Sequence, residues 1–230
     1  MIVGQGLIAN AFREHFDADP GVVVYASGVS NSRETRAEEF ARERRMLQEF
    51  VGGEPVLLYF STCSVNDQEL QESAYVRHKK EMEALVAQAA RFAIFRLPQV
   101  VGRTRNPNTL TNYLHGKVVS GEPFQVWGRA RRNLIDVDDV VRIVRHLLAD
   151  GRAEGQTIEV ASPFYSSIPE LIRILEAVLG RTANYSVVDA GGAYPIDTSI
   201  AVEAARACGV RFDAAYVRLL LEKYYGSHAS

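Results

Sequence analysis

Hydroxyl groups and one lysine gather in a short stretch of this chain. Ser61-Thr62-Cys63-Ser64 directly follows the apolar run 56–60, and Tyr75 comes thirteen residues after Thr62. Lys79 stands four residues beyond Tyr75, a spacing that places both side chains on one face if the segment is helical. A phenol, an ammonium group and a strand-end hydroxyl could together act on a polar ligand. The alternative is a half-buried tyrosine, a solvated lysine and a threonine that only satisfies backbone groups.

A second motif lies near the N-terminus, where a short apolar run breaks at two glycines. Gly4-Gln5-Gly6-Leu7-Ile8-Ala9 has the pattern G-x-G-x-x-A between a predicted strand and a predicted helix. Glycine lets the backbone approach a pyrophosphate, and the free N–H groups of a helix N-terminus favour an anion. The motif therefore predicts a dinucleotide site, and the alternative is a tight turn that needs small residues.

Alternating strands and helices must position both motifs. Continuous apolar runs predict strands at 1–3, 22–26, 56–60 and 92–95, and helical patterns separate them. This alternation predicts the α/β class, with a Rossmann-like, doubly wound parallel sheet joined by right-handed crossovers. The strand-end hydroxyls would then lie at the carboxyl edge of the sheet, where open α/β folds bind ligands.

The second half of the chain adds further helices and a smaller lobe. Helical patterns occur at 140–148, 171–179, about 198–208 and about 213–225, and a strand-like run occurs at 157–161. We predict one Rossmann-like domain over residues 1–162, with an insert at about 103–132, and a small C-terminal lobe over 163–230. Asp138 precedes a helical run and is interpreted as an N-cap, so no metal site is predicted.

The composition argues against several classes of protein. The formal net charge is −2 and the arginines are scattered, so neither a nucleic acid nor an anionic membrane is an expected partner. Cys63 and Cys208 fit no metal-ligand spacing and do not make a disulfide framework. No apolar run approaches the roughly 20 residues of a membrane span, and the N-terminus lacks a signal-peptide pattern. We expect a cytoplasmic protein that binds a small molecule.

Five segments together resemble the extended short-chain dehydrogenase/reductase superfamily, which contains NAD-dependent nucleotide-sugar epimerases, dehydratases and ketoreductases. They are the glycine turn, the strand end Ser61-Thr62, the pair Tyr75 and Lys79, the stretch 95–102 and the stretch 132–140. The resemblance spans most of the chain. It implies a nucleotide-sugar substrate and an NAD or NADP cofactor, with the preference between the two unresolved. Since homologues often dimerise, a homodimer is a further expectation.

The resemblance also implies a role for each matching residue. Tyr75 would exchange a proton with a substrate hydroxyl or carbonyl, with Lys79 favouring its phenolate and holding the nicotinamide ribose. Thr62 would hydrogen-bond the reacting oxygen. The implied cofactor contacts are Gly4, Gln5, Gly6, Leu7, Ile8, Ala26, Ser27, Gly28, Ser61, Tyr75, Lys79, Pro98 and Val100. The implied substrate contacts are Cys63, Ser64, Asn106, Asn108, Arg129 and Arg132, although both arginines could instead be exposed charge.

The chain departs from the family pattern where adenosine would bind. The second predicted strand does not end in the acidic residue that usually holds the adenosine ribose, and no obvious arginine takes its place. The run 22–26 is more similar to the family's fourth strand, so the fold is expected to lack a strand–helix–strand block. Arg33 and Arg36 are expected on a solvated helix face. Cys63-Ser64 also replaces the Asp-Glu pair of the family's dehydratases, which argues against sugar dehydration.

The expected function is NAD(P)-dependent ketoreduction or epimerisation of a nucleotide-activated sugar by Thr62, Tyr75 and Lys79. The sequence does not choose between the two reactions, because both can use the same three groups. The alternative is a truncated, non-catalytic module that binds a nucleotide or supports a partner enzyme. The shortened adenosine region motivates that alternative, and the intact triad opposes it.

Overall fold

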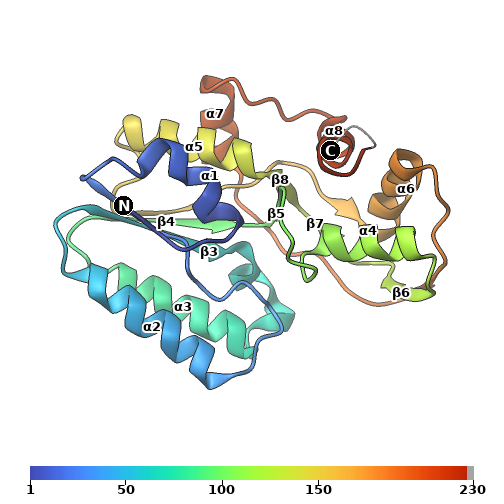
Figure 1. Cartoon of the computed structure of the whole chain (residues 1–230), viewed down its shortest axis with the longest axis horizontal. Coiled ribbons are helices and arrows are strands. Elements are labelled where there is room, and N and C mark those ends of the chain that lie inside the picture. The colour runs from blue at the N-terminus through green and yellow to red at the C-terminus, as the bar shows by residue number, and fades with distance from the viewer. Residues whose placement is uncertain (227–230) are drawn as a thin grey trace.

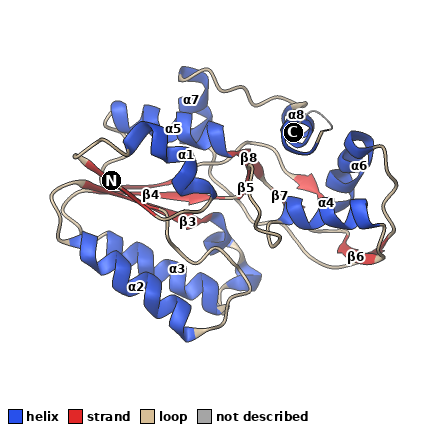
Figure 2. Ribbon diagram, viewed as in Figure 1, coloured by secondary structure: helices blue, strands red, loops and turns tan. Residues whose placement is uncertain are grey.

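A parallel sheet with helices on both faces forms the larger part of the molecule, and a second lobe lies beside it (Figure 1, Figure 2). The computed structural model describes residues 1–226. The sheet has five strands in the order β1-β2-β3-β4-β9. These strands are β1 (Ile2–Val3), β2 (Val22–Tyr25), β3 (Val56–Thr62), β4 (Phe92–Leu97) and β9 (Gln156–Glu159). The predicted Rossmann-like α/β class is confirmed.

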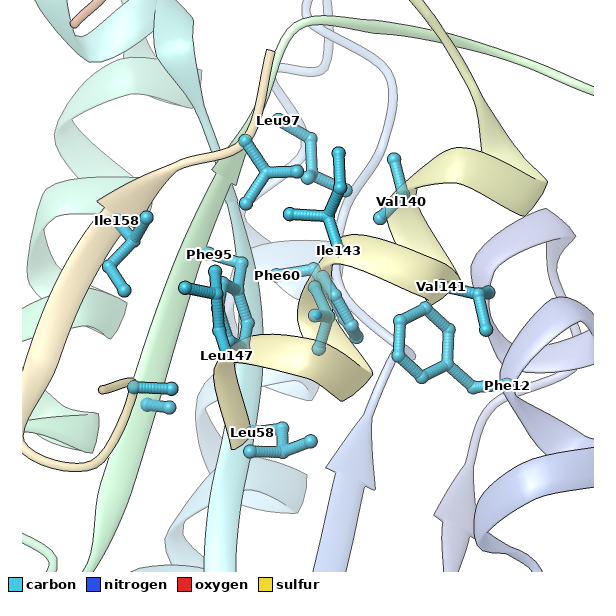
Figure 3. Packing of buried hydrophobic residues seen from close by; sticks show 14 of the residues in the cluster. Phe12, Leu58, Phe60, Phe95, Leu97, Val140, Val141, Ile143, Leu147 and Ile158 are labelled. Carbon is cyan, nitrogen blue, oxygen red and sulfur yellow. The ribbon is translucent and has the colours of Figure 1, made fainter. Parts of the chain in front are cut away.

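Helices bury both faces of this sheet. One face carries α1 (Leu7–Phe16) and α5 (Val137–Ala149), and the other carries α2 (Ala37–Val51) and α3 (Ala74–Val86) (Figure 1). Successive residues of a strand point to opposite faces. Phe60 therefore packs against Phe12 of α1, with ring centroids 5.0 Å apart (Figure 3), whereas Tyr59 belongs to the cluster on the α2 and α3 side. Burial on both faces explains the continuous apolar runs.

The first strand, which leads into the glycine turn, is an edge strand. Within residues 1–226, β1 pairs only with β2. In the common Rossmann order 3-2-1-4-5-6, the first strand lies between the second and the fourth. Here β2 occupies the fourth-strand position beside β1. This arrangement agrees with the expected loss of a strand–helix–strand block.

The missing block also changes the hand of one connection. The strands advance in a single direction across the sheet, yet α1 and α5 lie on the opposite face from α2 and α3. The crossovers through α1 and α5 therefore have the opposite hand to those through α2 and α3. Because they cannot all be right-handed, that prediction is wrong. For the connection through α1, the missing block gives the reason. This helix stays on the same face of the sheet but now leads to a strand on the other flank of β1.

The second lobe is assembled from three separate parts of the chain. Its elements are α4 (Leu110–Ser120), β6 (Phe124–Trp127), β7 (Arg131–Arg132), β10 (Ser166–Ser167), α6 (Ile168–Leu179), β11 (Tyr185–Val188) and α8 (Tyr216–Tyr225). β6 pairs with β11 in parallel, and β7 pairs with β10 in antiparallel orientation. One hydrophobic cluster joins α4, α6 and α8. The lobe therefore includes the predicted 103–132 insert, and the boundary at residue 162 stays a prediction.

The remaining elements connect the two parts. A short parallel pair, β5 (Gln99–Val101) with β8 (Leu134–Asp136), lies between sheet and lobe (Figure 1). Two 3₁₀ turns, η1 (Cys63–Asn66) and η2 (Gln68–Leu70), follow β3. Helix α7 (Ser199–Ala207) packs on α5 over the sheet, so the chain returns from the lobe before it enters α8. No helix in residues 1–226 has the length and apolar character needed to cross a membrane.

An acidic cluster attaches α8 to the start of α5. Asp136 is the N-cap of α5, because its Oδ1 accepts the N–H of Asp138 at 3.0 Å. The prediction that Asp138 is the cap is therefore wrong by two residues. Lys223 donates to Asp136 Oδ2 at 2.7 Å, and Tyr224 donates to Asp136 Oδ1 at 2.7 Å. Over residues 1–226, no group of three or more His, Cys, Asp or Glu side chains could hold a metal ion.

Replacing Asp136 with Ala should destabilise the protein by about 3 kcal/mol, because the helix loses its cap and α8 loses two hydrogen bonds to a carboxylate. Asp138→Ala removes only a contact of the more exposed Asp138 with Lys223 and should cost about 1 kcal/mol or less. Urea denaturation at pH 7 measures both values. Equal losses in the two variants would show that Asp136 has no special part in attaching α8.

Candidate active site

A cavity of about 560 Å³ runs along the carboxyl edge of the sheet and reaches the second lobe. Its volume lies in the range of small-molecule sites. It brings together most of the residues predicted from separate motifs. They are Gln5, Gly6, Leu7, Ile8, Ala26, Ser27, Gly28, Ser61, Thr62, Ser64, Tyr75, Lys79, Pro98, Val100, Asn106, Asn108 and Arg132.

Three predicted site residues do not line this cavity. The Cys63 side chain is fully buried and its thiol donates to the carbonyl of Arg96 at 3.4 Å, so a substrate contact there is not supported. Burial also raises the pKa of this thiol. Arg129 is largely exposed and lies 3.2 Å from the carboxylate of Asp189, which corrects its assignment to the substrate site. Gly4 belongs to the glycine turn but does not line the cavity.

The two glycines of the turn have different tasks. Gly4 adopts a φ of +126°, and a Cβ at this position would lie 2.5 Å from the carbonyl oxygen of Ala26. A Cβ on Gly6 would meet nothing within 4 Å. Gly6 is also the N-cap of α1, and no side chain forms a capping hydrogen bond there. The turn therefore packs tightly against the end of β2 and leaves open space at the helix N-terminus, which suits a phosphate group.

Thr62, Tyr75 and Lys79 meet at the centre of the cavity. Ser73 caps α3 by accepting the N–H of Val76 at 3.2 Å, so the helix begins just before Tyr75. Thr62 at the end of β3 and Tyr75 both line the cavity, and the Thr62 side chain acts to lower the pKa of Tyr75. Lys79 Nζ lies 6.0 Å from the centroid of the Tyr75 ring. The helical spacing and the strand end together produce the expected three-residue arrangement.

Ser61 is turned away from a ligand by its own hydrogen bond. Its hydroxyl donates to Glu83 Oε1 at 2.5 Å, and Glu83 also receives two hydrogen bonds from Arg96. Ser61 lies in the cavity wall, but its side chain is part of this buried ion-pair network. Any contact that it makes with a cofactor would use its backbone.

A buried carboxylate that sequence reasoning missed lies beneath Lys79. Glu43 of α2 is fully buried and accepts hydrogen bonds from Lys79 Nζ at 3.0 Å and from the Tyr59 hydroxyl at 2.7 Å. Burial opposes ionisation, but the charge of Lys79 and the hydrogen bonds outweigh it, and the pKa of Glu43 falls to about 2. The signal was present in the sequence, because Glu43 occupies a position of the apolar stripe Phe40, Leu47, Phe50.

Burial raises the pKa of Tyr75, the Thr62 hydrogen bond lowers it, and the charge of Glu43 raises it again. The net direction is upward. This direction does not favour the phenolate. The Lys79 ammonium is paired with Glu43, and its expected action on Tyr75 stays a prediction.

Other cavity-lining residues were not predicted. Ser30, Ser32 and Arg42 lie near the glycine turn, where the adenosine half of a dinucleotide would be expected. Arg36, by contrast, pairs with Glu34 and is exposed as expected, but it is the N-cap residue that precedes α2 and does not lie on the helix face. At the lobe end the cavity contains Tyr194, whose hydroxyl lies 3.5 Å from Ser64 Oγ. Ser30, Ser32 and Tyr194 lie in loops, where the sequence offers no periodic signal, and Arg42 is one of several charged residues of α2.

Gly4→Ala should destabilise the protein by about 2–4 kcal/mol, because the new methyl group would collide with the Ala26 carbonyl and the backbone angle is strained for alanine. Gly6→Ala should leave the free energy of unfolding within about 0.5 kcal/mol of the wild type. Thermal and chemical denaturation provide the comparison. A Gly4→Ala protein as stable as Gly6→Ala would contradict the packing assigned to the turn.

Glu43 should make the protein sensitive to acid. Its pKa is about 2 in the folded protein and near 4.3 in an unfolded chain, so its contribution is complete above about pH 4.5 and is lost as the pH falls toward 2. Linkage gives a loss of roughly 2–3 kcal/mol. Urea denaturation between pH 6 and 3 should therefore show a shallower pH dependence for Glu43→Gln than for the wild type. Identical slopes would rule out this source of acid sensitivity.

Comparison with known proteins identifies the family of this chain. The model of the NAD dependent epimerase/dehydratase family matches residues 7–161. No curated protein sequence matches the chain. Several solved structures share the fold at low sequence identity, and three of them illustrate the range.

UDP-glucuronic acid 4-epimerase from Bacillus cereus, in complex with UDP-glucuronic acid and NAD, has 18% identity and a TM-score of 0.70, over 89% of this chain and 74% of that chain. UDP-glucose 4-epimerase from Thermus thermophilus, in complex with NAD, has 17% identity and a TM-score of 0.65, over 96% and 81%. RMD from Pseudomonas aeruginosa, complexed with NADPH, has 17% identity and a TM-score of 0.68, over 96% and 95%. Since the family model covers more than half of the chain, this protein belongs to the NAD-dependent epimerase/dehydratase family.

Proposed function

We propose that this protein is an NAD(P)-dependent enzyme that carries out ketoreduction or epimerisation on a nucleotide-activated sugar. The observation that carries the proposal is the single cavity that contains both the open N-terminus of α1 and the group formed by Thr62, Tyr75 and Lys79. A phosphate-binding turn without these side chains would indicate nucleotide binding alone. Their presence together supports chemistry.

The residues present fit a nicotinamide dinucleotide. Gly6 leaves space for the pyrophosphate at the N-terminus of α1, where backbone N–H groups and the helix dipole favour an anion. Lys79 keeps one donor for the ribose, and Pro98 and Val100 line the nicotinamide end. When bound, the nicotinamide supplies or accepts a hydride. Related structures contain NAD or NADPH, and both remain candidates for this chain.

Tyr75 would move the proton that accompanies hydride transfer. Its hydroxyl lies in the cavity beside Thr62, which is suited to hydrogen-bond the same substrate oxygen. In reduction Tyr75 gives its proton to a carbonyl oxygen, and in oxidation it takes a proton from a hydroxyl. Thr62 orients the oxygen in both directions, so the triad serves either reaction.

The lobe end of the cavity suits the nucleotide sugar. Ser64, Asn106, Asn108, Arg132 and Tyr194 line this end with hydroxyl, amide and guanidinium groups. Structures that share the fold were determined with UDP-glucuronic acid or UDP-glucose, which motivates sugar nucleotides as the substrate class. Neither Cys63 nor Ser64 supplies the acid and base that elimination of water needs, so we do not propose dehydration.

A second candidate is a nucleotide-binding module without turnover. The observation that favours it is the edge position of β1, which leaves the cavity without the neighbouring strand that usually carries the adenosine-binding acid. Under this alternative the chain would bind a nucleotide, or support a partner enzyme, without reacting.

Titration with NADH and NADPH, followed by nicotinamide fluorescence, tests cofactor binding. We expect at least one of the two to bind, and Gly6→Ala to weaken binding at least tenfold because its methyl group occupies the phosphate space. The near-wild-type stability expected for Gly6→Ala makes it an informative variant. Absence of binding for both cofactors, with and without UDP-sugars, would refute the enzyme proposal.

Tyr75→Phe should reduce turnover by at least about 100-fold while changing cofactor affinity less than threefold, because only the proton-transferring hydroxyl is removed. Tyr113→Phe, at an exposed tyrosine of α4, is the matched control and should keep full activity. Assays with NAD(P)H and 4-keto sugar nucleotides, and with UDP-sugars, provide the rates. Turnover of Tyr75→Phe within tenfold of the wild type would exclude Tyr75 as the proton donor or acceptor.

A further inference from the structure

Four polar groups surround the Glu43 carboxylate, and one of them is Lys79. Oε1 accepts from Lys79 Nζ at 3.0 Å and from the Tyr59 hydroxyl at 2.7 Å. Oε2 accepts the backbone N–H of Val29 at 2.6 Å and lies 2.9 Å from His78 Nε2. Glu43 is fully buried, and Lys79 is 3% exposed. A carboxylate with this many partners is held in one position and stays ionised.

The surrounding chain is shaped to hold this pair. A Cβ on Gly28 would lie 2.6 Å from Glu43 Oε1 and 2.7 Å from Lys79 Nζ, so only glycine lets the loop after β2 cover them. The Tyr25 hydroxyl donates to the backbone carbonyl of Glu43 at 3.1 Å. Strand, loop and two helices therefore converge on one ion pair.

Burial has the largest effect on the pKa of Tyr75, which it raises, and the ion pair adds to the electrostatic surroundings of this phenol. An ammonium group this close to a buried phenol would by itself favour the phenolate. The adjacent carboxylate opposes that effect, and the charge of Glu43 acts on Tyr75 in the direction that disfavours ionisation. The other groups that face Tyr75 are Thr62 and Tyr194, both uncharged at neutral pH. His78 and Tyr59 face Glu43 rather than the cavity centre.

We propose that Glu43 is a positioning residue for Lys79: its carboxylate fixes the ammonium and cancels its charge, so that Tyr75 stays protonated and the site donates a proton to a substrate carbonyl. This inference rests on the proposed function and deepens it, because it selects carbonyl reduction as the favoured direction. Lys79 keeps one N–H for the cavity, since its other two donors are used by Glu43 and Tyr59.

Carbonyl reduction at this site transfers one hydride and one proton. The carbonyl carbon gains a hydride, with its electron pair, from the reduced nicotinamide dinucleotide, and the carbonyl π electrons move to oxygen. That oxygen takes the proton of the Tyr75 hydroxyl and becomes a sugar hydroxyl. Tyr75 is left as a phenolate, regains a proton from water and returns to its starting state.

Ionisation of Tyr75 in the cofactor-free protein is the direct test. NMR of protein labelled at tyrosine Cζ with ¹³C follows each phenol between pH 7 and 10.5, and Tyr75→Phe assigns the Tyr75 signal. The wild-type signal should remain that of a phenol throughout. In Glu43→Gln the ammonium is uncompensated, and the Tyr75 signal should begin to move toward that of a phenolate within this range. Glu38→Gln, an exposed glutamate of α2, is the matched control and should show no shift.

A double variant separates the charge of Lys79 from other effects. The double variant Lys79→Gln/Glu43→Gln should restore the wild-type Tyr75 signal, because the cation and the carboxylate that compensates it are both absent. A double variant in which Tyr75 titrates as readily as in Glu43→Gln overturns the proposal, as does a Tyr75 signal in folded Glu43→Gln that matches the wild type throughout. If Glu43→Gln does not fold, Glu43→Asp replaces it. Its shorter side chain withdraws the carboxylate from Lys79, so a smaller downward shift is expected and no shift overturns the proposal.

Kinetics provide the second measurement. The decline of carbonyl reduction at high pH should begin about one unit lower in Glu43→Gln than in the wild type. A decline that begins at the same pH in both proteins overturns the proposal. The NMR titration needs neither cofactor nor substrate, so a protein that fails to bind NADH or NADPH refutes the proposed function without affecting the reading of Glu43.

Discussion

The buried ion pair between Glu43 and Lys79 is the interaction on which the arrangement of the site depends. It joins α2 to α3, receives the hydroxyl of Tyr59 from β3, and lies under the loop that follows β2. Removing either charge would leave the other buried without its ion-pair partner, which costs far more than loss of an exposed ion pair. The same contact that stabilises the fold therefore determines where Lys79 lies and how much of its charge reaches Tyr75.

The second constraint is the sheet itself, which is a shortened version of the Rossmann arrangement. With β1 at the edge, the cavity has a wall formed by the glycine turn, the end of β2 and the end of β3, and no strand beyond β1 in residues 1–226. Under the proposed function, this wall would hold the phosphate and nicotinamide parts of a dinucleotide. The adenosine part would then depend on loop residues and Arg42 of α2, which also line the cavity. Shortening also accounts for the reversed hand of the crossover through α1.

Much of this site could be predicted from local patterns. Gly6 followed by a helix, Thr62 at a strand end and Tyr75 four residues before Lys79 depend on spacing and periodicity, which a sequence displays directly. Predictions were weaker where an assignment relied on residue type alone. Cys63 and Arg129 have suitable chemistry for a ligand contact, but one side chain points into the core and the other pairs with Asp189 at the surface. Neither orientation leaves a pattern in the chain.

The sequence by itself determined the α/β class, the glycine turn before α1 and the Tyr75–Lys79 spacing, because each follows from interactions between residues close together in the chain. Only the tertiary structure decided that Glu43, 36 residues from Lys79, neutralises this lysine. A glutamate in a charged helix is normally solvated, and its burial depends on Tyr59, Val29 and His78 arriving together to satisfy it. How strongly the Lys79 charge acts on Tyr75 is therefore determined by the tertiary structure.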